Sequence, residues 1–359
     1  MSKPYTAAVI GLGGVSRDHL AAIGESSAFE LVAVCDTDPE RVRSAERPGT
    51  VKTFADAAAM MAAVAPDLVV VATPSCSHAW LTMEVAEWGP RAILCEKPMS
   101  VHYRDAVTMA ATCAKWEVEL LVNHQRRLVG AAFGRAQVAA GLIGELLQVE
   151  ARCGGDFLSD GTHAVDAARC LGGDRPAGSV FGAVDMGRER TQRYGHDVEQ
   201  SAFVSWQDDR DTRYLVYTGE LARRRQYQDW LLTGTEGVLW HPGGVLQPYW
   251  WIHDGKAGDH RIGFDEHHWF PVPVPCTQGG SWRLLGPGKA APELGLSLRL
   301  LGERLGGATE PHPLRAEGAL RVHEIVNAGY LSALARRCIE LPLPAETEFP
   351  MDLLAAEAY

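Results

Sequence analysis

The stretch Gly11-Leu12-Gly13-Gly14-Val15-Ser16 decides the fold that we expect for this chain. It follows an apolar run, residues 7–10, that predicts a short strand, and residues 15–23 after it are predicted to form a helix. The spacing matches G-x-G-x-x-G except at the last position, which is Ser. In that motif the first glycine permits a tight turn, and the second lets the backbone approach a pyrophosphate at the helix N-terminus. A dinucleotide-binding turn is therefore expected, with an ordinary glycine-rich turn as the alternative.

Strands and helices alternate along the first third of the chain. After the first pair, strands are predicted at 29–35, 68–72, 92–95 and 118–122, and helices at 39–45, 55–63, 78–88 and 101–116. Strands separated by helices of this length form βαβ units with right-handed crossovers, and therefore a parallel sheet. We predict that residues 1–123 form one doubly wound, dinucleotide-binding Rossmann domain.

The pattern changes after residue 123. A helix at 131–140, a strand at 146–152 and a helix at 161–171 precede strand-like runs with little helix between them, at 180–184, 202–206, 213–218 and 226–232. Runs of strands without helices predict a mostly antiparallel sheet. Residues 240–290 predict long loops with short strands, and residues 314–335 a long amphipathic helix. Residues 124–359 are therefore expected to form a second domain, with the option that the C-terminal helix packs back on the first.

The composition is that of a globular protein. Of the 359 residues, 46% are hydrophobic and 22% are charged. The net charge of −11 argues against a nucleic-acid partner, and no window reaches the ~18 apolar residues of a membrane helix. The N-terminus enters a strand directly, so we expect no secretory signal. The eight cysteines include no C-x-x-C pair, which favours reduced core thiols in a cytoplasmic protein over a disulfide framework.

Asp36 ends the second predicted strand, at about the spacing from the glycine turn (~20 residues) that dinucleotide-binding domains use. A carboxylate there accepts hydrogen bonds from the ribose hydroxyls of NAD and repels the 2′-phosphate of NADP. The next residues are Thr37 and Asp38 rather than an arginine. The alternative is a helix cap, a role that Asp38 fills better.

Two further polar elements follow predicted strands. Thr73-Pro74-Ser75 forms a lip on which a cofactor can lie, and His78 is expected to contact the ribose or, slightly favoured, to cap the next helix. Glu96-Lys97-Pro98 follows the buried strand at 92–95. A lysine at the carboxyl end of a strand beside a dinucleotide fold is well placed to handle a proton while a nicotinamide handles a hydride. The alternative is a surface lysine before a proline turn.

These motifs occur in a recognisable order: Gly11–Ser16, Thr73-Pro74-Ser75 with His78, Glu96-Lys97-Pro98, Asn123 with Arg126-Arg127, and Gly141-Leu142-Ile143-Gly144-Glu145. The series resembles the Gfo/Idh/MocA family of glucose–fructose oxidoreductases and inositol dehydrogenases. The resemblance covers residues 5 to 170 and resumes more weakly at Val198-Glu199, 312–333 and 341–343.

The resemblance implies a Rossmann domain followed by an α/β domain with a large, open, mostly antiparallel sheet. It implies NAD(P)-dependent chemistry on sugars and cyclitols, a second domain that binds substrate, and subunits paired through the open sheet faces as a homo-dimer or homo-tetramer. In the family the E-K-P lysine contacts substrate and nicotinamide ribose and takes part in proton transfer, which gives Lys97 that role. Glu96 is then expected to position the cofactor or Lys97. Arg127 is expected to hold a substrate hydroxyl or a cofactor phosphate, or to belong to a solvated arginine pair.

The family's second catalytic element is Asp-x-Gly-x-His at a helix start. His163 matches its histidine and Gly161 its glycine, but Ser159 occupies the acid position and Asp160 comes one residue late. Asp160 and Asp166 are each three residues from His163, so either carboxylate can share a helical face with the imidazole and stabilise its cation; we assign this role to Asp160. The alternative is that Ser159 or Asp160 caps the helix and that His163 is a core residue.

Three other clusters stay open. His253, His260, His267 and His268 lie near acidic residues, but their spacing fits no compact motif, so no metal is predicted. Tyr249-Trp250-Trp251 and Trp269 can stack on a sugar ring, pack beneath the sheet or form a subunit contact. Arg223-Arg224-Arg225 favours a solvated strand end over an anion site.

Together these observations predict an NAD-dependent oxidoreductase that interconverts a secondary alcohol and a ketone on a sugar, glycoside or cyclitol. Two alternatives are a glycoside-cleaving or epimerising enzyme that holds NAD tightly, and a non-catalytic dinucleotide-sensing protein. The predicted catalytic residues are Lys97, His163 and Asp160. The predicted cofactor-binding residues are Gly11, Leu12, Gly13, Gly14, Val15, Asp36, Thr73, Pro74, Ser75, His78, Glu96, Lys97, Asn123 and Arg127.

Overall fold

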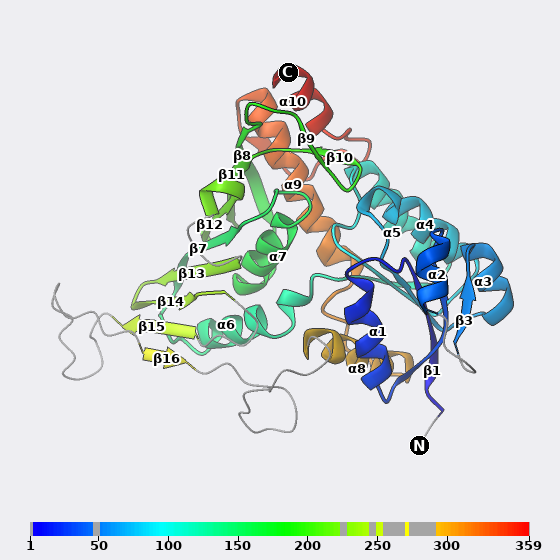
Figure 1. Cartoon of the computed structure of the whole chain (residues 1–359). Helices are drawn as coiled ribbons and strands as arrows, with labels where there is room; N and C mark the ends of the chain where they lie inside the picture. The colour runs from blue at the N-terminus through cyan, green and yellow to red at the C-terminus, as the bar shows by residue number, and fades with distance from the viewer. Residues whose placement is uncertain are drawn as a thin grey trace. The chain divides into compact units, whose positions relative to one another are not determined.

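The structure, a computed structural model, describes residues 3–45, 51–222, 228–243, 249–253, 270–272 and 292–358. The chain divides into two compact units, Met1–Gln125 with Gly286–Leu320, and Arg126–Leu285 with Arg321–Tyr359. The first break lies two residues beyond the expected boundary at 123. The described part of Gly286–Leu320, which the sequence assigned to the second domain, groups with the first unit. Figure 1 shows the helices and strands of both units, coloured along the chain.

The first unit contains a six-stranded parallel sheet with the strand order β3-β2-β1-β4-β5-β6. Its strands are β1 (Tyr5–Ile10), β2 (Phe29–Cys35), β3 (Lys52–Phe54), β4 (Leu68–Val71), β5 (Ala92–Cys95) and β6 (Glu119–Val122). This order confirms the Rossmann prediction. The order reverses between β1 and β4, and ligands of such sheets bind outside the carboxyl ends of the strands at this switch point. The short β3 is the one strand of this sheet that the sequence pattern did not reveal.

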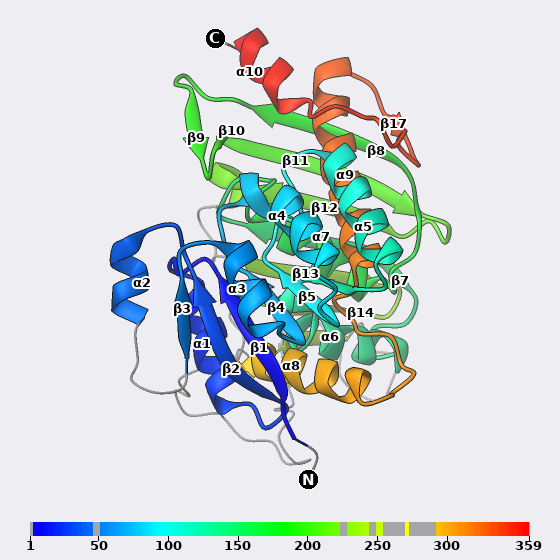
Figure 2. The same ribbon diagram turned by 90° about the vertical axis from the view of Figure 1, so that its right-hand side faces the viewer.

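Helices cover this sheet (Figure 2). They are α1 (Ser16–Glu25), α2 (Pro39–Ala45), α3 (Ala57–Val64), α4 (Ser75–Glu87), α5 (Tyr103–Lys115) and α8 (Pro292–Leu305). Helix α8 packs beside α1, and we did not predict it. A Cβ at Gly302 would lie 2.6 Å from the Cβ of Ala28, so this glycine permits the close approach while lowering the helix propensity of the segment.

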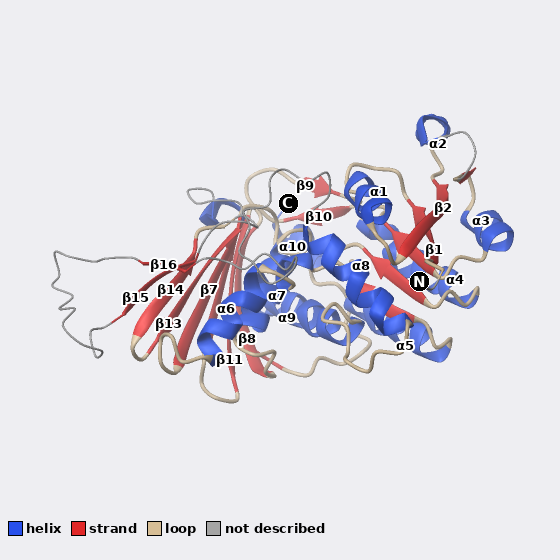
Figure 3. Cartoon of the chain, turned by 90° about the horizontal axis from the view of Figure 1, so that it is seen from below, coloured by secondary structure: helices blue, strands red, loops and turns tan. Residues whose placement is uncertain are grey.

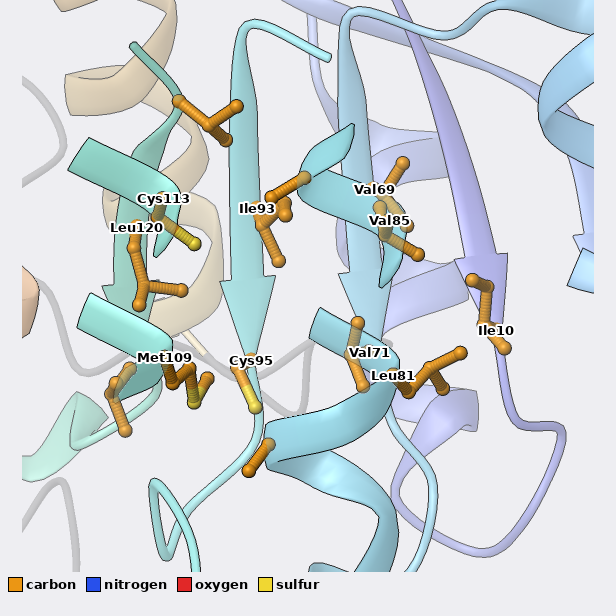
Figure 4. Close-up of a cluster of buried hydrophobic side chains, with 14 of the residues drawn as sticks. Ile10, Val69, Val71, Leu81, Val85, Ile93, Cys95, Met109, Cys113 and Leu120 are labelled. Atoms are coloured by element: carbon orange, nitrogen blue, oxygen red, sulfur yellow. The ribbon is translucent and has the colours of Figure 1, made fainter. Parts of the chain in front are cut away.

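A buried apolar layer lies between the sheet and helices α4 and α5. Figure 4 shows Ile10, Val71 and Ile93 on the strand side, facing helix residues that include Leu81 and Met109. All four residues of β4 and of β5 are buried. Their continuous apolar sequence is what a strand covered on both faces requires.

The second unit contains a nine-stranded sheet with the order β16-β15-β14-β13-β7-β12-β11-β8-β17. Its strands are β7 (Leu146–Cys153), β8 (Ala177–Asp185), β11 (Ser201–Asp208), β12 (Arg213–Thr218), β13 (Gln228–Gly234), β14 (Gly237–His241), β15 (Tyr249–His253), β16 (Phe270–Val272) and β17 (Ile339–Glu340). Strands β7 and β12 pair in parallel, and the remaining described pairs are antiparallel. The predicted mostly antiparallel sheet is therefore confirmed. A separate hairpin joins β9 (Thr191–Arg193) to β10 (His196–Val198).

Helices of the second unit lie along one face of this sheet, as Figure 3 shows for α7 and α9. The helices are α6 (Gly130–Ala139), α7 (Gly161–Leu171), α9 (Ala316–Ala335), whose first turn groups with the first unit, and α10 (Met351–Ala358). Burial alternates along β11 and β12, with Val204 and Val216 buried beneath the helices and Phe203 and Tyr217 half-buried on the other face. One sheet face is thus packed, and the other presents aromatic side chains.

The cysteines and the helix lengths can be compared with the sequence-based expectations. Cys35, Cys95 and Cys113 are buried thiols, as predicted, whereas Cys76 and Cys338 are exposed. Within the described parts of the chain, the helices are too short or too polar to cross a membrane.

Gly11 is the glycine whose replacement tests the turn at the end of β1. Its φ is +92°, and an added Cβ would lie 2.6 Å from the carbonyl oxygen of Ala72. We expect Gly11→Ala to destabilise the protein by about 1–3 kcal/mol or more, because the residue is strained and the neighbouring backbone must shift. Gly14→Ala is the matched control, since a Cβ there meets nothing within 4 Å. Equal midpoints of denaturant unfolding for the two variants would contradict this account of the turn.

Candidate active site

The glycine turn lies between the carboxyl ends of β1, β2 and β4. The Gly11 N–H donates to the Cys35 carbonyl over 2.8 Å, and the Leu12 N–H donates to Asp36 Oδ2 over 2.7 Å. Gly14 is exposed, and a Cβ at Gly13 would have only Arg41 Nη1 as a neighbour, at 4.0 Å. The side chain of Val15, which precedes α1, makes no capping hydrogen bond. The turn is therefore open around Gly13 and Gly14, beside the N-terminus of α1, where an anion can bind.

Asp36 is nearly buried at the end of β2, with its carboxylate fixed by the backbone. Oδ2 accepts from Leu12 and Oδ1 from the Asp38 N–H at 2.8 Å. The sequence analysis found no arginine directly after Asp36, but Arg41 on α2 reaches to 3.5 Å from Oδ2 and 3.3 Å from Asp38 Oδ2. Helix α2 places the Arg41 guanidinium near the Asp36 carboxylate. The residues directly after Asp36 in the sequence did not predict this contact.

The lip after β4 is held by a buried histidine. His78 Nδ1 lies 2.7 Å from the Pro98 carbonyl, and Nε2 lies 2.8 Å from the Thr73 carbonyl. Helix α4 begins at Ser75, so His78 is not its cap, and its ring bridges the two loops that follow β4 and β5. Burial lowers the pKa of this imidazole. The predicted ribose contact stays a prediction.

Glu96 is the most constrained charged residue of this edge. Its side chain is 5% exposed, and Oε1 lies 2.6 Å from His19 Nε2 and 2.6 Å from Asn123 Nδ2. Burial alone would raise the pKa of the carboxyl, but the bonds from His19 and Asn123 and the charge of Lys97 outweigh it and lower the pKa to about 2. The Lys97 N–H donates to Oε2 at 3.3 Å, so the turn that carries Lys97 is anchored on this carboxylate.

Buried polar atoms at this edge fit a dinucleotide. Ser75 at the start of α4 and Asn123 after β6 are both buried, and the Ser75 hydroxyl and Asn123 Oδ1 have no hydrogen-bond partner among the described residues. Such atoms carry a free-energy cost unless a ligand satisfies them. The open glycine turn, Asp36 and these two atoms all lie at carboxyl ends of the parallel strands. They would hold the pyrophosphate, a ribose and the polar groups of the nicotinamide half.

In the second unit, His163 lies in the first turn of α7, directly after the loop that follows β7. Every residue of α7 is buried, and His163 is 5% exposed. Asp156 shapes the turn, because its Oδ1 accepts from the Ser159 N–H at 2.6 Å and its carbonyl accepts from the Gly161 N–H at 2.9 Å. Asp160 occupies the N-cap position of α7, but its side chain makes no capping hydrogen bond, so it does not cap the helix in the way that the alternative interpretation supposed.

The carboxylate of Asp160 pairs with an arginine that sequence analysis missed. Arg193 on β9 donates through Nη1 to Asp160 Oδ2 at 2.5 Å and to Asp156 Oδ2 at 2.8 Å. Ser159, at the family's acid position, lies 3.3 Å from His196 Nε2 through its hydroxyl. The predicted support of His163 by Asp160 stays a prediction. A lone arginine in a short hairpin offers no sequence signal.

Glu199 lies under the same turn. It is 4% exposed and accepts from the Phe157 N–H at 2.5 Å and from the Tyr330 hydroxyl at 2.8 Å. Burial and the nearby Asp156 raise the pKa of its carboxyl. With Arg193, these two acids line a pocket of about 510 Å³ within the second unit. The family resemblance in the sequence includes Val198-Glu199, and this match was the sequence signal for Glu199.

Arg127 is the predicted cofactor residue whose surroundings differ most from expectation. Its guanidinium is buried and binds Asp166 through Nε and Nη2, at 3.0 and 2.7 Å, and Asp174 through Nη1 and Nη2, both at 2.8 Å. Burial disfavours the charge, but Asp166 and Asp174 outweigh it and raise the pKa of Arg127. The guanidinium is thus buried and paired inside the second unit, so the alternative of a solvated arginine pair is wrong. The predicted contact with a substrate hydroxyl or a cofactor phosphate stays a prediction.

Some predicted clusters fall outside the described side chains. These are the histidines at 253, 260, 267 and 268, the aromatic residues at 249–251 and 269, and the arginines at 223–225. Among the side chains that the structure does describe, no group of three His, Cys, Asp or Glu residues is arranged to hold a metal ion.

Comparison with known proteins relates the first domain to a protein family. Residues 5–124 match the model of an oxidoreductase family with an NAD-binding Rossmann fold, GFO_IDH_MocA. The first domain of the chain is therefore similar to the Gfo/Idh/MocA family. Both the family resemblance and the NAD-binding class of the first domain are thereby confirmed. Lys97 belongs to the matched region and His163 lies beyond it.

Curated proteins similar to this chain have sugar-related names. D-apiose dehydrogenase of Paraburkholderia graminis is 36% identical over 48% of this chain and 51% of its own length. D-glucoside 3-dehydrogenase of Escherichia coli is 31% identical over 46% and 54%. The chain thus spans about half the length of these curated relatives. A levoglucosan dehydrogenase solved with NADH and levoglucosan shares the fold, with a TM-score of 0.78, 19% identity, and coverage of 95% of this chain and 100% of that one.

Removal of Arg127 tests its structural role. We expect Arg127→Ala to destabilise the protein by about 3–5 kcal/mol, because Asp166 would remain buried without its cation. Arg135→Ala removes a half-exposed partner of Asp174 and should cost under about 1 kcal/mol. Denaturant unfolding of both variants measures the difference. A stable Arg127→Ala protein with weakened NAD binding would instead support the cofactor role.

Proposed function

We propose that this protein is an NAD-dependent oxidoreductase that interconverts a secondary alcohol and a ketone on a sugar, glycoside or cyclitol. The observation that carries the proposal is the Glu96 carboxylate, which anchors the Lys97 turn at the same sheet edge as the open glycine turn and Asp36. The similar proteins named above, dehydrogenases of D-apiose, D-glucosides and levoglucosan, support the substrate class.

Proton transfer is assigned to one residue in each unit. Bound NAD would supply the hydride acceptor and donor. Lys97 is half-buried on an anchored turn, which suits a group that takes part in proton transfer at the reacting oxygen of the substrate. His163 accepts the hydroxyl proton when alcohol becomes ketone and returns it in the reverse direction. The buried acids Asp156 and Asp160, bridged by Arg193, fix the start of α7 and thereby the backbone of His163.

A substrate panel tests the proposed activity. Sugars, glycosides and cyclitols are incubated with the protein and NAD⁺, and NADH formation is followed by absorbance. With a substrate found, Lys97→Ala and His163→Ala should each lower turnover by about 10²-fold or more, the scale of a general acid–base contribution. Folded variants with near-normal turnover would refute the assignment. Formation of a product without net formation of NADH would favour the alternative, a glycoside-cleaving or epimerising enzyme that holds NAD tightly.

The cofactor preference follows from Asp36. We expect NAD to bind at least about tenfold more tightly than NADP, because a 2′-phosphate beside the carboxylate is repelled. Arg41 offsets part of this repulsion, so Arg41→Ala should widen the preference. Titration of both cofactors against protein fluorescence measures it. Equal affinity in the parent, or tighter NADP binding, would contradict the role of Asp36.

The half-buried sheet face supports a homo-dimer or homo-tetramer. Phe181 on this face is 42% exposed. The ring centroids of Phe181 and Phe203 are 6.4 Å apart, and those of Phe203 and Tyr217 are 5.0 Å apart. The guanidinium of Arg152 lies over the Tyr217 ring. A second copy of the chain would cover these apolar rings. Light scattering at micromolar concentration should give at least twice the monomer mass, and Phe203→Asp should lower it. A parent monomer would end this proposal.

A further inference from the structure

His19 is a buried histidine that the sequence analysis did not select. It lies in the first turn of α1, directly after the glycine turn, and is 2% exposed. Its Nε2 is 2.6 Å from Glu96 Oε1, although 77 residues separate the two along the chain. Helix α1 follows β1 and Glu96 follows β5, and β4 lies between these strands in the sheet. The contact thus spans the switch point of the sheet.

The direction of this hydrogen bond follows from the charge on Glu96. Hydrogen bonds and nearby charge lower the pKa of the carboxyl to about 2, so it is ionised near neutral pH and can only accept. His19 Nε2 must therefore carry a proton and donate it. Asn123, which follows β6, donates through Nδ2 to the same Glu96 oxygen over 2.6 Å. Glu96 Oε1 is held from two sides, while Oε2 faces the Lys97 N–H.

We propose that His19 is a positioning residue that couples the glycine turn and α1 to the turn that carries Lys97. His19 holds the Glu96 carboxylate in the orientation that anchors the Lys97 backbone. The glycine turn, which we propose binds the phosphates, and the Lys97 turn therefore keep fixed positions relative to each other. The inference rests on the proposed function only for the task of Lys97; the coupling itself is a property of the first unit.

Loss of the His19 donor has a defined physical consequence. A buried carboxylate that loses one of its hydrogen-bond donors will turn toward a nearby cation. Lys97 is a cation whose charge already acts on Glu96. In His19→Leu the carboxylate should therefore rotate toward the Lys97 ammonium and displace it. In His19→Gln the side-chain amide can still donate to Oε1, so the parental geometry should largely return.

Lysine NMR measures the coupling without an enzymatic assay. The chain has six lysines, so reductive methylation with ¹³C-formaldehyde gives a small set of resonances, and Lys97→Arg assigns the signal of Lys97. In the parent we expect this signal to shift when NAD⁺ is added. His19→Leu should move the signal in the free protein and reduce its response to NAD⁺ at least several-fold, while His19→Gln restores both.

Matched variants and a second measurement keep the proposal falsifiable. Glu25→Gln changes an exposed charge on the same helix and should leave the Lys97 signal in place. Identical Lys97 signals in the parent, His19→Leu and His19→Gln would overturn the proposal, as would equal shifts in both His19 variants. If His19→Leu does not fold, ¹⁵N-histidine spectra of the parent decide the matter: an Nε2 without a proton near neutral pH overturns the proposal. A parent that binds no NAD⁺ would instead defeat the proposed function.

Discussion

A single buried carboxylate, that of Glu96, constrains the functional edge of the first unit. A charged group at 5% exposure is tolerated only where hydrogen bonds replace water, and here they come from α1 and from the end of β6. The turn after β5, the helix after the glycine turn and the end of β6 must therefore keep their positions together. The sheet brings these ends to one edge, and the Glu96 carboxylate fixes their side chains there.

The second unit uses the same physical device around a different turn. Asp156, Asp160 and Glu199 are buried at the start of α7, and they are held by Arg193, backbone N–H groups and the Tyr330 hydroxyl. In both units, then, a proposed proton-handling residue lies shortly after the carboxyl end of a strand, on the Lys97 turn in the first unit and in the first turn of α7 in the second, and buried acids hold the backbone there. Such preorganisation is what proton transfer in a dehydrogenase site requires.

The sequence predicted the parts of the fold that follow from local pattern. Continuous apolar runs such as Leu68–Val71 marked the buried parallel strands, and the glycine spacing marked the turn after β1. Contacts between distant segments were not predictable in this way: Arg41 folds back on Asp36, Arg193 reaches Asp160 from a hairpin, and His19 meets Glu96 across the sheet. These partners are single residues whose pairing depends on tertiary packing. The sequence did not predict helix α8, whose two glycines lower the helix propensity of the segment; Gly302 permits close packing against Ala28.

A crystal structure of the protein with NAD⁺ tests the central claim, that this carboxyl edge is a dinucleotide site built around Glu96. The account predicts the pyrophosphate at the N–H groups of Gly13 and α1, a ribose at Asp36, and the nicotinamide half near Lys97 and Asn123. The Glu96 carboxylate should keep its bonds to His19 and Asn123. Dinucleotide density elsewhere, or a Glu96 carboxylate that leaves His19 in the complex, would contradict it.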